Sequence, residues 1–261
     1  MATLISHAEE PRYMKAALLV GGAGTRMRPL TYIVPKAMLP LAGKPLLERT
    51  LEYLRNHGIE DVVLCVAYLK RQIINYFEDG GRFGVRIQYA ESDSPLGTGG
   101  QLRTAKPFLE GETFLAMNGD IFTSLPLDSL VAFHRESEAF LTIALKRFEF
   151  QMPYGRVVLD RSNRITRFDE KPAISSQVNA GIYGCEPGIF SFFPEKDPCS
   201  LEHDVFPAVI RAKRKVTGYR SDAYWGDIGK LSDYEKINAE AISNGGHPPK
   251  TAGDPDTTSQ S

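Results

Sequence analysis

A glycine-rich segment followed by two cationic side chains is the part of this sequence best suited to chemistry. The apolar run Lys15–Val20 leads directly into Gly21-Gly22-Ala23-Gly24-Thr25-Arg26, and Pro35-Lys36 follows further along the chain. Glycines let the backbone approach a bulky anion, and the N–H groups of such a turn can point at phosphate oxygens. Arg26 and Lys36 would add the positive charge that the backbone lacks. The segment therefore predicts a binding site for a nucleoside triphosphate.

Two common phosphate-binding motifs do not match this segment. A Walker A loop would need the spacing Gly-x-x-x-x-Gly-Lys-Ser/Thr, and a dinucleotide fingerprint would need a third glycine three residues after Gly24. A Gly-Gly-x-Gly turn is also common as an ordinary tight turn. The turn taken alone leaves that alternative open.

The longer pattern is more specific. The string Gly-Gly-x-Gly-Thr-Arg-x-x-Pro is followed by Pro35-Lys36 and then by Leu39-Pro40-x-x-x-Lys44-Pro45. Here the sequence resembles the sugar-1-phosphate nucleotidylyltransferases (nucleotide-sugar pyrophosphorylases), closest to the mannose-1-phosphate and heptose-1-phosphate guanylyltransferases. The resemblance runs from about Met14 to about Ile242.

The resemblance implies nucleotidyl transfer. A phosphate oxygen of a sugar 1-phosphate attacks the α-phosphorus of a nucleoside triphosphate, pyrophosphate leaves, and a nucleotide-sugar remains. The main expectation is GTP with mannose 1-phosphate or a heptose 1-phosphate. One alternative is a glucose-1-phosphate thymidylyl- or uridylyltransferase, and another is a non-catalytic regulatory subunit of the same fold. Both reactants are anions, so such an enzyme must mainly neutralise, align and stabilise them.

The resemblance also assigns the phosphate and metal ligands. Backbone donors would come from Gly21, Gly22, Gly24 and Thr25, and positive charge would come from Arg26 and Lys36, the first two catalytic candidates. Asp120 and Asp227 would share one Mg²⁺, which takes a few carboxylates together with phosphate oxygens and water. Other interpretations stay open for single residues: a surface lysine for Lys36, a turn residue for Asp120 and a helix N-cap for Asp227.

The resemblance places the sugar-binding residues in the second half of the chain. Gly155 would let the sugar approach the backbone, and Glu170 and Asn179 would bind sugar hydroxyls. Lys171, a further catalytic candidate, would bind the phosphate of the sugar 1-phosphate. Considered without the resemblance, Glu170-Lys171-Pro172 is a charged edge before a turn, and Asn179 is a turn former.

The segment from Glu91 to Gly100 resembles the base-binding loop of the family, with Gly97 and Thr98 as further nucleotide ligands. Uridylyl and thymidylyl members tend to carry Gln where Glu91 falls. A carboxylate only accepts hydrogen bonds, and guanine offers two adjacent donors on its Watson–Crick edge. Glu91 therefore favours guanine, although a solvent-facing Glu91 remains the alternative.

The order of expected elements predicts an α/β fold. Strands are expected near 15–20, 61–66, 85–89 and 113–117, and helices are expected after Pro45, near 71–78 and after Gly100. This alternation predicts a doubly wound, Rossmann-like, mostly parallel sheet with helices on both faces. Ligands of such sheets bind beyond the carboxyl ends of the strands, where the glycine turn and Asp120 would lie. Further strands are expected at 139–146, 156–159, 165–168 and 178–183, and helices at 187–193, 201–213 and 232–242.

The composition of the chain disfavours a nucleic-acid-binding, a membrane-spanning and a secreted protein. The chain has 261 residues, with 31 Lys and Arg against 32 Asp and Glu, so no basic field favours nucleic acid. No apolar run is long enough to cross a bilayer, no secretory signal is recognisable at the N-terminus, and the three scattered cysteines suit a reducing compartment. We therefore expect a cytoplasmic protein without a membrane partner, and a homo-oligomer is left open.

The predicted organisation is one nucleotidyltransferase domain, residues 14–244, with a nucleotide half at about 14–138 and a sugar-phosphate half at about 139–244. A flexible arm is expected at 1–13 and a disordered tail at 245–261, where the composition changes to Gly, Pro, Ser, Thr and Asp.

Overall fold

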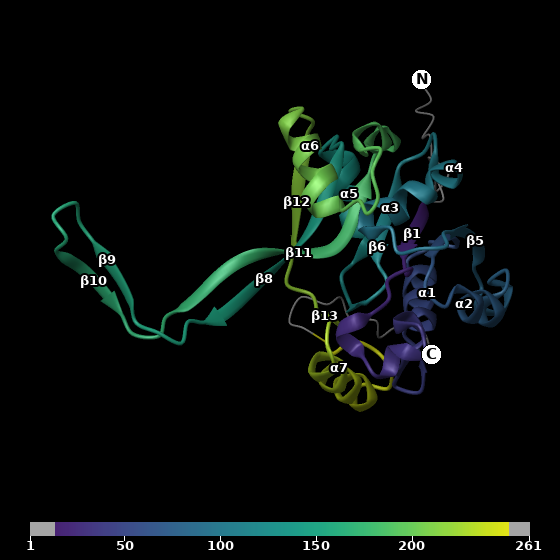
Figure 1. The fold of residues 1–261 in the computed structure, drawn as a ribbon, viewed down its shortest axis with the longest axis horizontal. Coiled ribbons are helices and arrows are strands. Elements are labelled where there is room, and N and C mark those ends of the chain that lie inside the picture. The colour runs from purple at the N-terminus through teal and green to yellow at the C-terminus, as the bar shows by residue number, and fades with distance from the viewer. Residues whose placement is uncertain (1–13, 251–261) are drawn as a thin grey trace, which may run out of the picture.

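A seven-stranded sheet forms the centre of the protein in a computed structural model, which describes residues 14–250 (Figure 1). The strand order is β12-β8-β11-β6-β1-β4-β5. The strand β1 (Lys15–Leu19) runs parallel to its two neighbours, β4 (Asp61–Val66) and β6 (Phe114–Asn118), and β5 (Arg86–Glu91) extends the parallel part at one edge. The first half of the chain thus forms the parallel sheet that its strand–helix alternation predicts.

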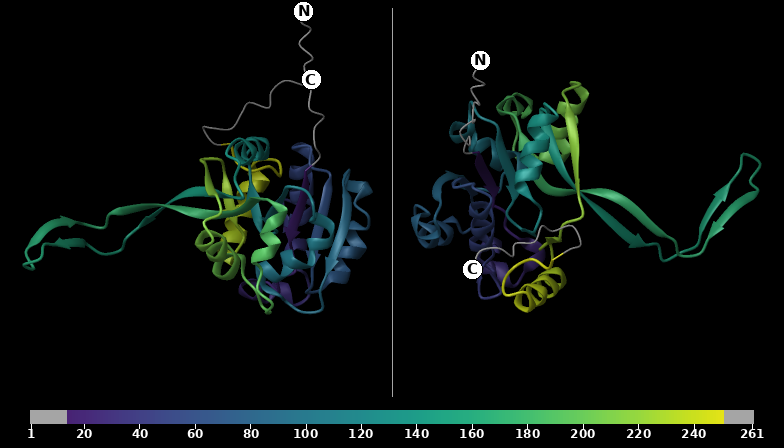
Figure 2. Two further views of the ribbon diagram at one scale, coloured as in Figure 1. Left: turned by 90° about the horizontal axis from the view of Figure 1, so that it is seen from above. Right: turned by 180° about the vertical axis from the view of Figure 1, so that it is seen from behind.

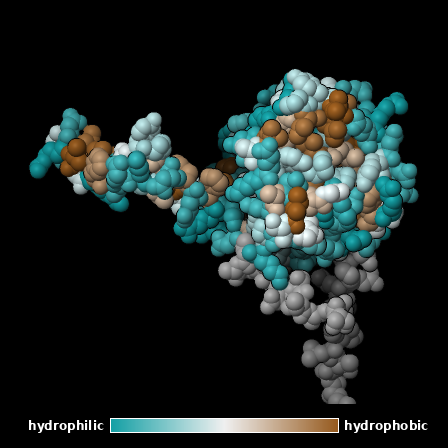
Figure 3. Space-filling view, turned by 90° about the horizontal axis from the view of Figure 1, so that it is seen from below, coloured by the Kyte–Doolittle hydropathy of each residue, from teal (hydrophilic) through white to brown (hydrophobic). Residues whose placement is uncertain are grey.

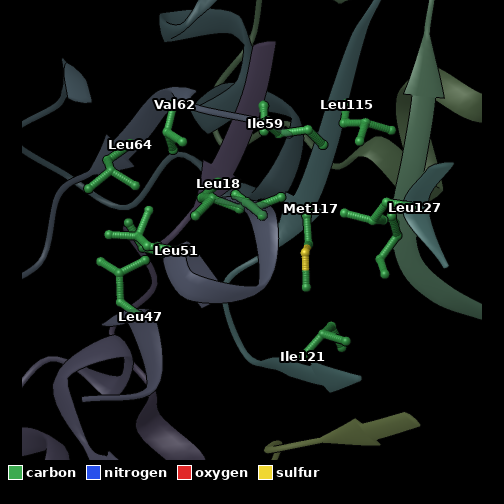
Figure 4. Packing of buried hydrophobic residues seen from close by; sticks show 14 of the residues in the cluster. Leu18, Leu47, Leu51, Ile59, Val62, Leu64, Leu115, Met117, Ile121 and Leu127 are labelled. Atoms are coloured by element: carbon green, nitrogen blue, oxygen red, sulfur yellow. The ribbon is translucent and has the colours of Figure 1, made fainter. Parts of the chain in front are cut away.

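Helices cover both faces of this sheet because successive residues of its buried strands point to opposite sides. On one face, Leu18 of β1 and Leu64 of β4 pack against Leu51 of α1 (Leu46–Asn56), as Figure 4 shows. On the other face, the adjacent residues Leu19 and Cys65 belong to a second core cluster. Helices α2 (Lys70–Phe77) and α5 (Leu127–Glu136) contribute to the first cluster, and helices α3 (Gly97–Thr104), α4 (Lys106–Leu109) and α6 (Phe206–Arg211) contribute to the second.

The second half of the chain adds the mixed part of the sheet. Strand β11 (Ala173–Cys185) pairs antiparallel with both β6 and β8 (Leu141–Gln151), and β12 (Val216–Ser221) pairs parallel with β8. A 3-10 helix at Pro187–Phe192 and a π-helical turn at Leu201–Val205 connect these elements and pack on the second core cluster.

A smaller unit lies beside the carboxyl ends of β1 and β6. Strands β7 (Ile121–Thr123) and β13 (Trp225–Asp227) form an antiparallel pair, followed by α7 (Leu231–Ser243). A third core cluster, which includes Met27, Phe122, Ile228 and Ile237, joins α7 to the segment after the glycine turn. That segment contains 3-10 turns at Thr25–Met27, Leu30–Tyr32 and Lys36–Met38, and the short strand pair of β2 (Pro40–Leu41) and β3 (Lys44–Pro45). Elsewhere in the chain, a further 3-10 turn at Gly81–Phe83 lies between α2 and β5.

A long two-stranded arm projects from the body of the protein (Figures 1 and 2). The ladder between β8 and β11 continues past the sheet to the pair Gln151–Ala173. Beyond it, β9 (Arg156–Leu159) and β10 (Ile165–Asp169) form a terminal hairpin. We call residues 147–172 the arm throughout.

The fold class predicted from the sequence is confirmed, while several single elements differ from the prediction. Strands β8 and β11 are longer than the predicted 139–146 and 178–183, and the predicted helix at 187–193 is a 3-10 helix. Helix α5 and strands β2, β3, β7, β12 and β13 were not predicted, whereas the strands predicted at 156–159 and 165–168 are β9 and β10. The predicted helix at 201–213 starts with a π-helical turn.

The flexible segment predicted at 1–13 lies outside the described residues, as does the part of the predicted tail from residue 251 onward. The described part of that tail, 245–250, begins with turns, and Gly246 N–H donates to the Ala241 carbonyl at 2.8 Å. Within the described range, no helix is long and apolar enough to cross a membrane.

Candidate functional site

The carboxyl ends of β1 and β6 open into one cavity. The glycine turn follows β1, and Asn118-Gly119-Asp120 follows at the end of β6, because parallel neighbours end at the same edge of a sheet. The cavity has a volume of about 210 Å³, and its lining includes Gly22, Gly24, Thr25, Arg26, Lys36 and Asp120. The structure thus brings together the predicted triphosphate ligands except Gly21, and one predicted metal ligand.

Two glycines of the turn are needed for different reasons. Gly24 has a φ of +57°, and a Cβ there would lie 3.0 Å from Thr31 Cγ2, so the position excludes larger residues on conformation and on space. Gly22 has nothing within 4 Å of the place where a Cβ would stand. A side chain at Gly22 would therefore occupy only space that the cavity offers to a ligand.

Gly21 makes a contact that sequence reasoning did not predict. Its N–H donates a 2.8 Å hydrogen bond to Oε1 of Gln101, a buried side chain of α3. A Cβ on Gly21 would lie 3.1 Å from the same oxygen. The N–H of Gly21 therefore fixes the turn to α3 in this structure, and the phosphate-binding role predicted for it stays a prediction.

Asp120 and Asp227 are brought together by the short ladder of β7 and β13. Asp227 pairs with Ile121, the residue after Asp120, and the Ile228 N–H donates to the Asp120 carbonyl at 3.0 Å. Gly229 lies between Asp227 and Arg26. A Cβ at this position would lie 3.3 Å from Asp227 Oδ2 and 3.4 Å from a guanidinium nitrogen of Arg26. Arg26 and Asp120 therefore line the cavity, and Asp227, which lines an adjacent hollow, lies close to both.

The electrostatics of the pair follow from this proximity. Burial raises the pKa of Asp227 above its ordinary value, and the negative charge of Asp120 raises it further, whereas Lys36 and Arg26 oppose the shift. Lys36 Nζ lies 2.5 Å from Asp120 Oδ2 in a largely buried ion pair. Asp120 thus lies close enough to Asp227 to disfavour the charge of Asp227, and two cations lie beside the pair.

A second hollow of about 540 Å³ adjoins the acidic pair on its other side. Its lining includes Asn179, Tyr224, Trp225, Asp227 and Lys230. Asn179, predicted to bind sugar, donates from Nδ2 to the Tyr183 hydroxyl at 2.9 Å and accepts the Gly181 N–H at 2.9 Å. The Trp225 indole donates to the Ala180 carbonyl at 2.8 Å, which fixes one side of the hollow.

The predicted base-binding residues lie at the ends of β5 and the start of α3. Glu91 is half-exposed and forms a 3.2 Å ion pair with Lys70, which also contacts Asp93. The Thr98 hydroxyl donates to Glu202 at 2.8 Å and accepts the Leu201 N–H at 3.0 Å. Gly97 has a φ of +75°, and a Cβ there would lie 2.4 Å from the Cys199 carbonyl. Gly97 and Thr98 therefore have structural contacts of their own, and their nucleotide-binding role stays a prediction.

The three remaining sugar-side residues are not brought to the cleft. Gly155, Glu170 and Lys171 lie on the arm, and a Cβ on Gly155 would stand 3.0 Å from a carboxylate oxygen of Glu170. The ladder from Ala173 to Asn179 is continuous, so Ala173 lies six residue steps from Asn179, about 20 Å at the rise of an extended strand, and Lys171 lies beyond that end of the strand. In this conformation these residues form a group of their own.

Sequence reasoning missed several residues of the site. Gln101 and Lys70 lie on helices whose contacts with the loops depend on the tertiary fold, and no local pattern marks them. Asn118 shares the motif of Asp120, and its Oδ1 is buried without a hydrogen-bond partner in the described part of the chain. Trp225 also belongs to the site, because it lines the second hollow.

The fold and the cleft define an α/β protein in which a glycine loop, two cations and one carboxylate line a cavity at the carboxyl edge of a parallel sheet, with a second carboxylate beside them. The chain belongs to the nucleotidyl transferase family, whose model matches residues 15–244. This confirms the family resemblance seen in the sequence motifs.

The relatives differ in the nucleotides and sugars that they are named for. A UTP–glucose-1-phosphate uridylyltransferase of Synechocystis is 37% identical over 85% of this chain, and a mannose-1-phosphate guanylyltransferase of Mycobacterium tuberculosis is 36% identical over 87%. The chain spans 61% and 64% of the lengths of these two relatives. Among solved structures, HddC from Yersinia pseudotuberculosis complexed with GMP-PN is similar with a TM-score of 0.69 and 26% identity, covering 87% of this chain and 99% of that one. A putative glucose-1-phosphate thymidylyltransferase from Bacillus anthracis has a TM-score of 0.71 at 22% identity, covering 88% and 95%, and supports the fold alone.

Proposed function

We propose that this protein transfers a nucleotidyl group from a nucleoside triphosphate to a sugar 1-phosphate, releasing pyrophosphate. The observation that carries this proposal is that Arg26, Lys36 and Asp120 line one cavity beside the glycine loop, while the β7–β13 ladder holds Asp227 next to Asp120. Family membership supports the same class of reaction. Because Arg26, Lys36 and both aspartates are present, a non-catalytic subunit of the same fold is disfavoured.

The residues fit one Mg²⁺ between Asp120 and Asp227. Burial and the negative charge of Asp120 both disfavour the ionised form of Asp227. A divalent cation between the two carboxylates would offset the loss of hydration and the repulsion. The described residues contain no group of three or more His, Cys, Asp or Glu side chains suited to a metal, so phosphate and water oxygens would complete the coordination. When bound, Mg²⁺ supplies charge neutralisation at the phosphates.

The protein's own side chains would position the reactants. Arg26 can grip two phosphate oxygens through its planar guanidinium, and Gly22 leaves room for the triphosphate beside the backbone. Lys36 would exchange its contact with Asp120 for phosphate oxygens as the metal takes that carboxylate. Holding two anions in line beside these cations accounts for catalysis without a covalent intermediate.

GTP is the proposed nucleotide, and mannose 1-phosphate or a heptose 1-phosphate is the proposed acceptor. Support comes from the half-exposed carboxylate of Glu91, which can accept from guanine, and from the guanylyltransferase names of several relatives. The uridylyltransferase relative is of equal similarity, so UTP with glucose 1-phosphate is the second candidate.

We propose a cytoplasmic location, since both substrates are soluble metabolites.

A panel of substrates tests the proposal. Pyrophosphate release would be measured for GTP, UTP, dTTP, ATP and CTP, each with mannose, glucose and heptose 1-phosphates in the presence of Mg²⁺. We expect the highest kcat/KM for GTP with mannose or a heptose 1-phosphate. A preference for UTP with glucose 1-phosphate would select the second candidate, and no turnover with any pair would refute the enzymatic assignment.

A further inference from the structure

The hairpin at the end of the arm has one apolar face. In an antiparallel ladder, directly paired residues point to the same side. Leu159 pairs with Ile165 and Val157 pairs with Phe168, and all four side chains are between 44% and 64% exposed. Figure 3 shows apolar side chains exposed along the arm. A two-stranded hairpin is marginally stable alone, so this face is built to pack against another surface.

The ladder between β8 and β11 holds this face away from the body of its own chain. Paired residues continue from Leu145–Asn179 to Gln151–Ala173, and the Met152 N–H bonds the Pro172 carbonyl at 3.0 Å. Folding the arm back onto its own cleft would break several of these cross-strand pairs. A second copy of the chain can receive the hairpin with the ladder intact.

The chemistry of the arm identifies which part of a second copy it reaches. Glu170 and Lys171, the predicted ligands of the sugar and its phosphate, follow the apolar hairpin directly and are exposed. At the base of the arm, Phe148 and Trp225 line the hollow beside Asp227, where an acceptor sugar phosphate would enter. The cleft and the arm therefore carry complementary parts of one site, which in the same chain are separated by the extended segment from Ala173 to Asn179, about 20 Å long.

We propose that two copies of this chain exchange arms, so that the apolar hairpin face of each packs beside the cleft of the other and presents Lys171 to the sugar phosphate bound there. This inference rests on the proposed function. A two-fold exchange covers both arms at once, as isologous dimers do. The exposed apolar residues of the arm also include Phe148, Phe150 and Tyr154. At roughly 100 Å² each, the apolar residues of two arms offer on the order of 1,400 Å², within the range that stable interfaces bury.

The first experiment measures the oligomeric state of the full chain by light scattering coupled to size-exclusion chromatography. We expect a dimer for the wild type and a monomer for the double variant Leu159→Ser/Phe168→Ser. Arg156→Ser is the matched control, because Arg156 lies on the opposite face of the same hairpin and should remain dimeric. All three positions are exposed, so a folding defect is not expected, and circular dichroism checks this. A monomeric wild type would overturn the proposal.

The second experiment asks whether the site is shared between copies. Asp120→Ala removes a metal ligand and Lys171→Ala removes the arm cation, and the two chains would be co-expressed with different tags and purified as a heterodimer. If arms are exchanged, one cleft in the heterodimer keeps Asp120 and receives an intact Lys171. We expect about half of the wild-type turnover per dimer, against near-zero turnover for each parent homodimer.

The outcomes separate this inference from the proposed function. An active wild type whose heterodimer is as inactive as its parents would overturn the exchange and leave the function standing. An active Lys171→Ala homodimer would also overturn it, since the arm lysine would then be dispensable. A wild type inactive with every substrate pair would refute the function, while the light-scattering experiment would still decide whether the hairpin face joins two copies.

Discussion

Asp120 and Asp227, more than a hundred residues apart in sequence, meet because the residue after Asp120 pairs with Asp227 in the ladder of β7 and β13. The Ile228 N–H bonds the Asp120 carbonyl at 3.0 Å, which fixes the two backbones together. The position of both carboxylates is therefore set by main-chain pairing rather than by flexible side chains. The main chain thus holds the pair in place for a cation, and the contact that has to open on binding is the ion pair of Lys36 with Asp120.

Replacing either carboxylate should stop the reaction while the fold is kept. We expect Asp120→Ala to lower kcat/KM by at least about 10²-fold, because half of the carboxylate pair that would hold Mg²⁺ is lost. The measurement is steady-state pyrophosphate release at saturating Mg²⁺. Asp222→Asn is the control, since Asp222 is exposed and lies close in sequence to β13 without lining the cleft. Near-normal turnover in Asp120→Ala would refute the assignment of the metal pair.

The stabilisation that Mg²⁺ provides should depend on pH through Asp227. The folded-state pKa of Asp227 lies above 3.8, so folding favours its protonated form, and this group destabilises the fold as pH rises through the window from 3.8 to the raised pKa. A metal binds the carboxylate, so its stabilisation is lost as pH falls through the raised pKa. We expect the increase in Tm on adding Mg²⁺ to be largest near neutral pH and to shrink in the acidic range.

Asp227→Asn tests the origin of that pH dependence. The asparagine cannot titrate and is a weaker metal ligand than a carboxylate. We therefore expect the increase in Tm on adding Mg²⁺ to be smaller in the variant and to vary less with pH over the same acidic range. Differential scanning fluorimetry of both proteins, with and without Mg²⁺, gives the comparison. A wild-type response to Mg²⁺ that stays constant through the acidic range would contradict the role given to Asp227.

Much of the nucleotide half could be predicted because its signals are local. The apolar runs at Lys15–Val20 and Asp61–Val66 are buried parallel strands, and Leu47, Leu51 and Leu54 recur at helical spacing on one face of α1. The glycine turn was recognised from spacing, and the structure places it at the carboxyl edge of the sheet as expected. Pairing Asp120 with Asp227 depended on the family resemblance, since no local pattern relates them.

The strands of the terminal hairpin were predicted at 156–159 and 165–168, but the extension of β8 and β11 into the arm was not, because it depends on contacts between distant residues. Phe148 and Phe150 alternate with charged residues beyond the predicted end of β8, and this alternation suits a strand only if β11 continues beside it. Likewise, the bonds from Gly21 to Gln101 and from Thr98 to Glu202 join segments eighty or more residues apart. Residue type marked Gly21 and Thr98 as candidates, but only the tertiary fold shows what they contact.

Alanine substitutions at Gly24 and Gly22 should have different effects, the first on the stability of the fold and the second on the affinity for the triphosphate. Gly24→Ala forces a Cβ into a left-handed conformation 3.0 Å from Thr31, and we expect a loss of about 1–2 kcal/mol in the free energy of unfolding. Gly22→Ala meets open space, so its stability should change by less than about 0.5 kcal/mol while the affinity for the triphosphate falls about tenfold. Urea unfolding and isothermal titration calorimetry measure the two quantities. Tight triphosphate binding by Gly22→Ala would remove Gly22 from the site.

The choice of base should respond to Glu91. We expect Glu91→Gln to lower the ratio of kcat/KM for GTP over UTP or dTTP by about tenfold, because an amide group replaces one acceptor oxygen with a donor. Asp93→Asn is the matched control, since Asp93 contacts the same Lys70 and is fully exposed. If both variants keep the wild-type ratio, Glu91 does not bind the base, and its ion pair with Lys70 is structural.

The account depends most on a divalent cation held by two aspartates beside the glycine loop. Anomalous diffraction from crystals grown with Mn²⁺ and a non-hydrolysable GTP analogue tests it directly. We predict a metal peak about 2 Å from a carboxylate oxygen of both Asp120 and Asp227, with the triphosphate beside Arg26 and Gly22. A metal bound elsewhere, or a nucleotide seated away from the glycine loop, would contradict the proposal.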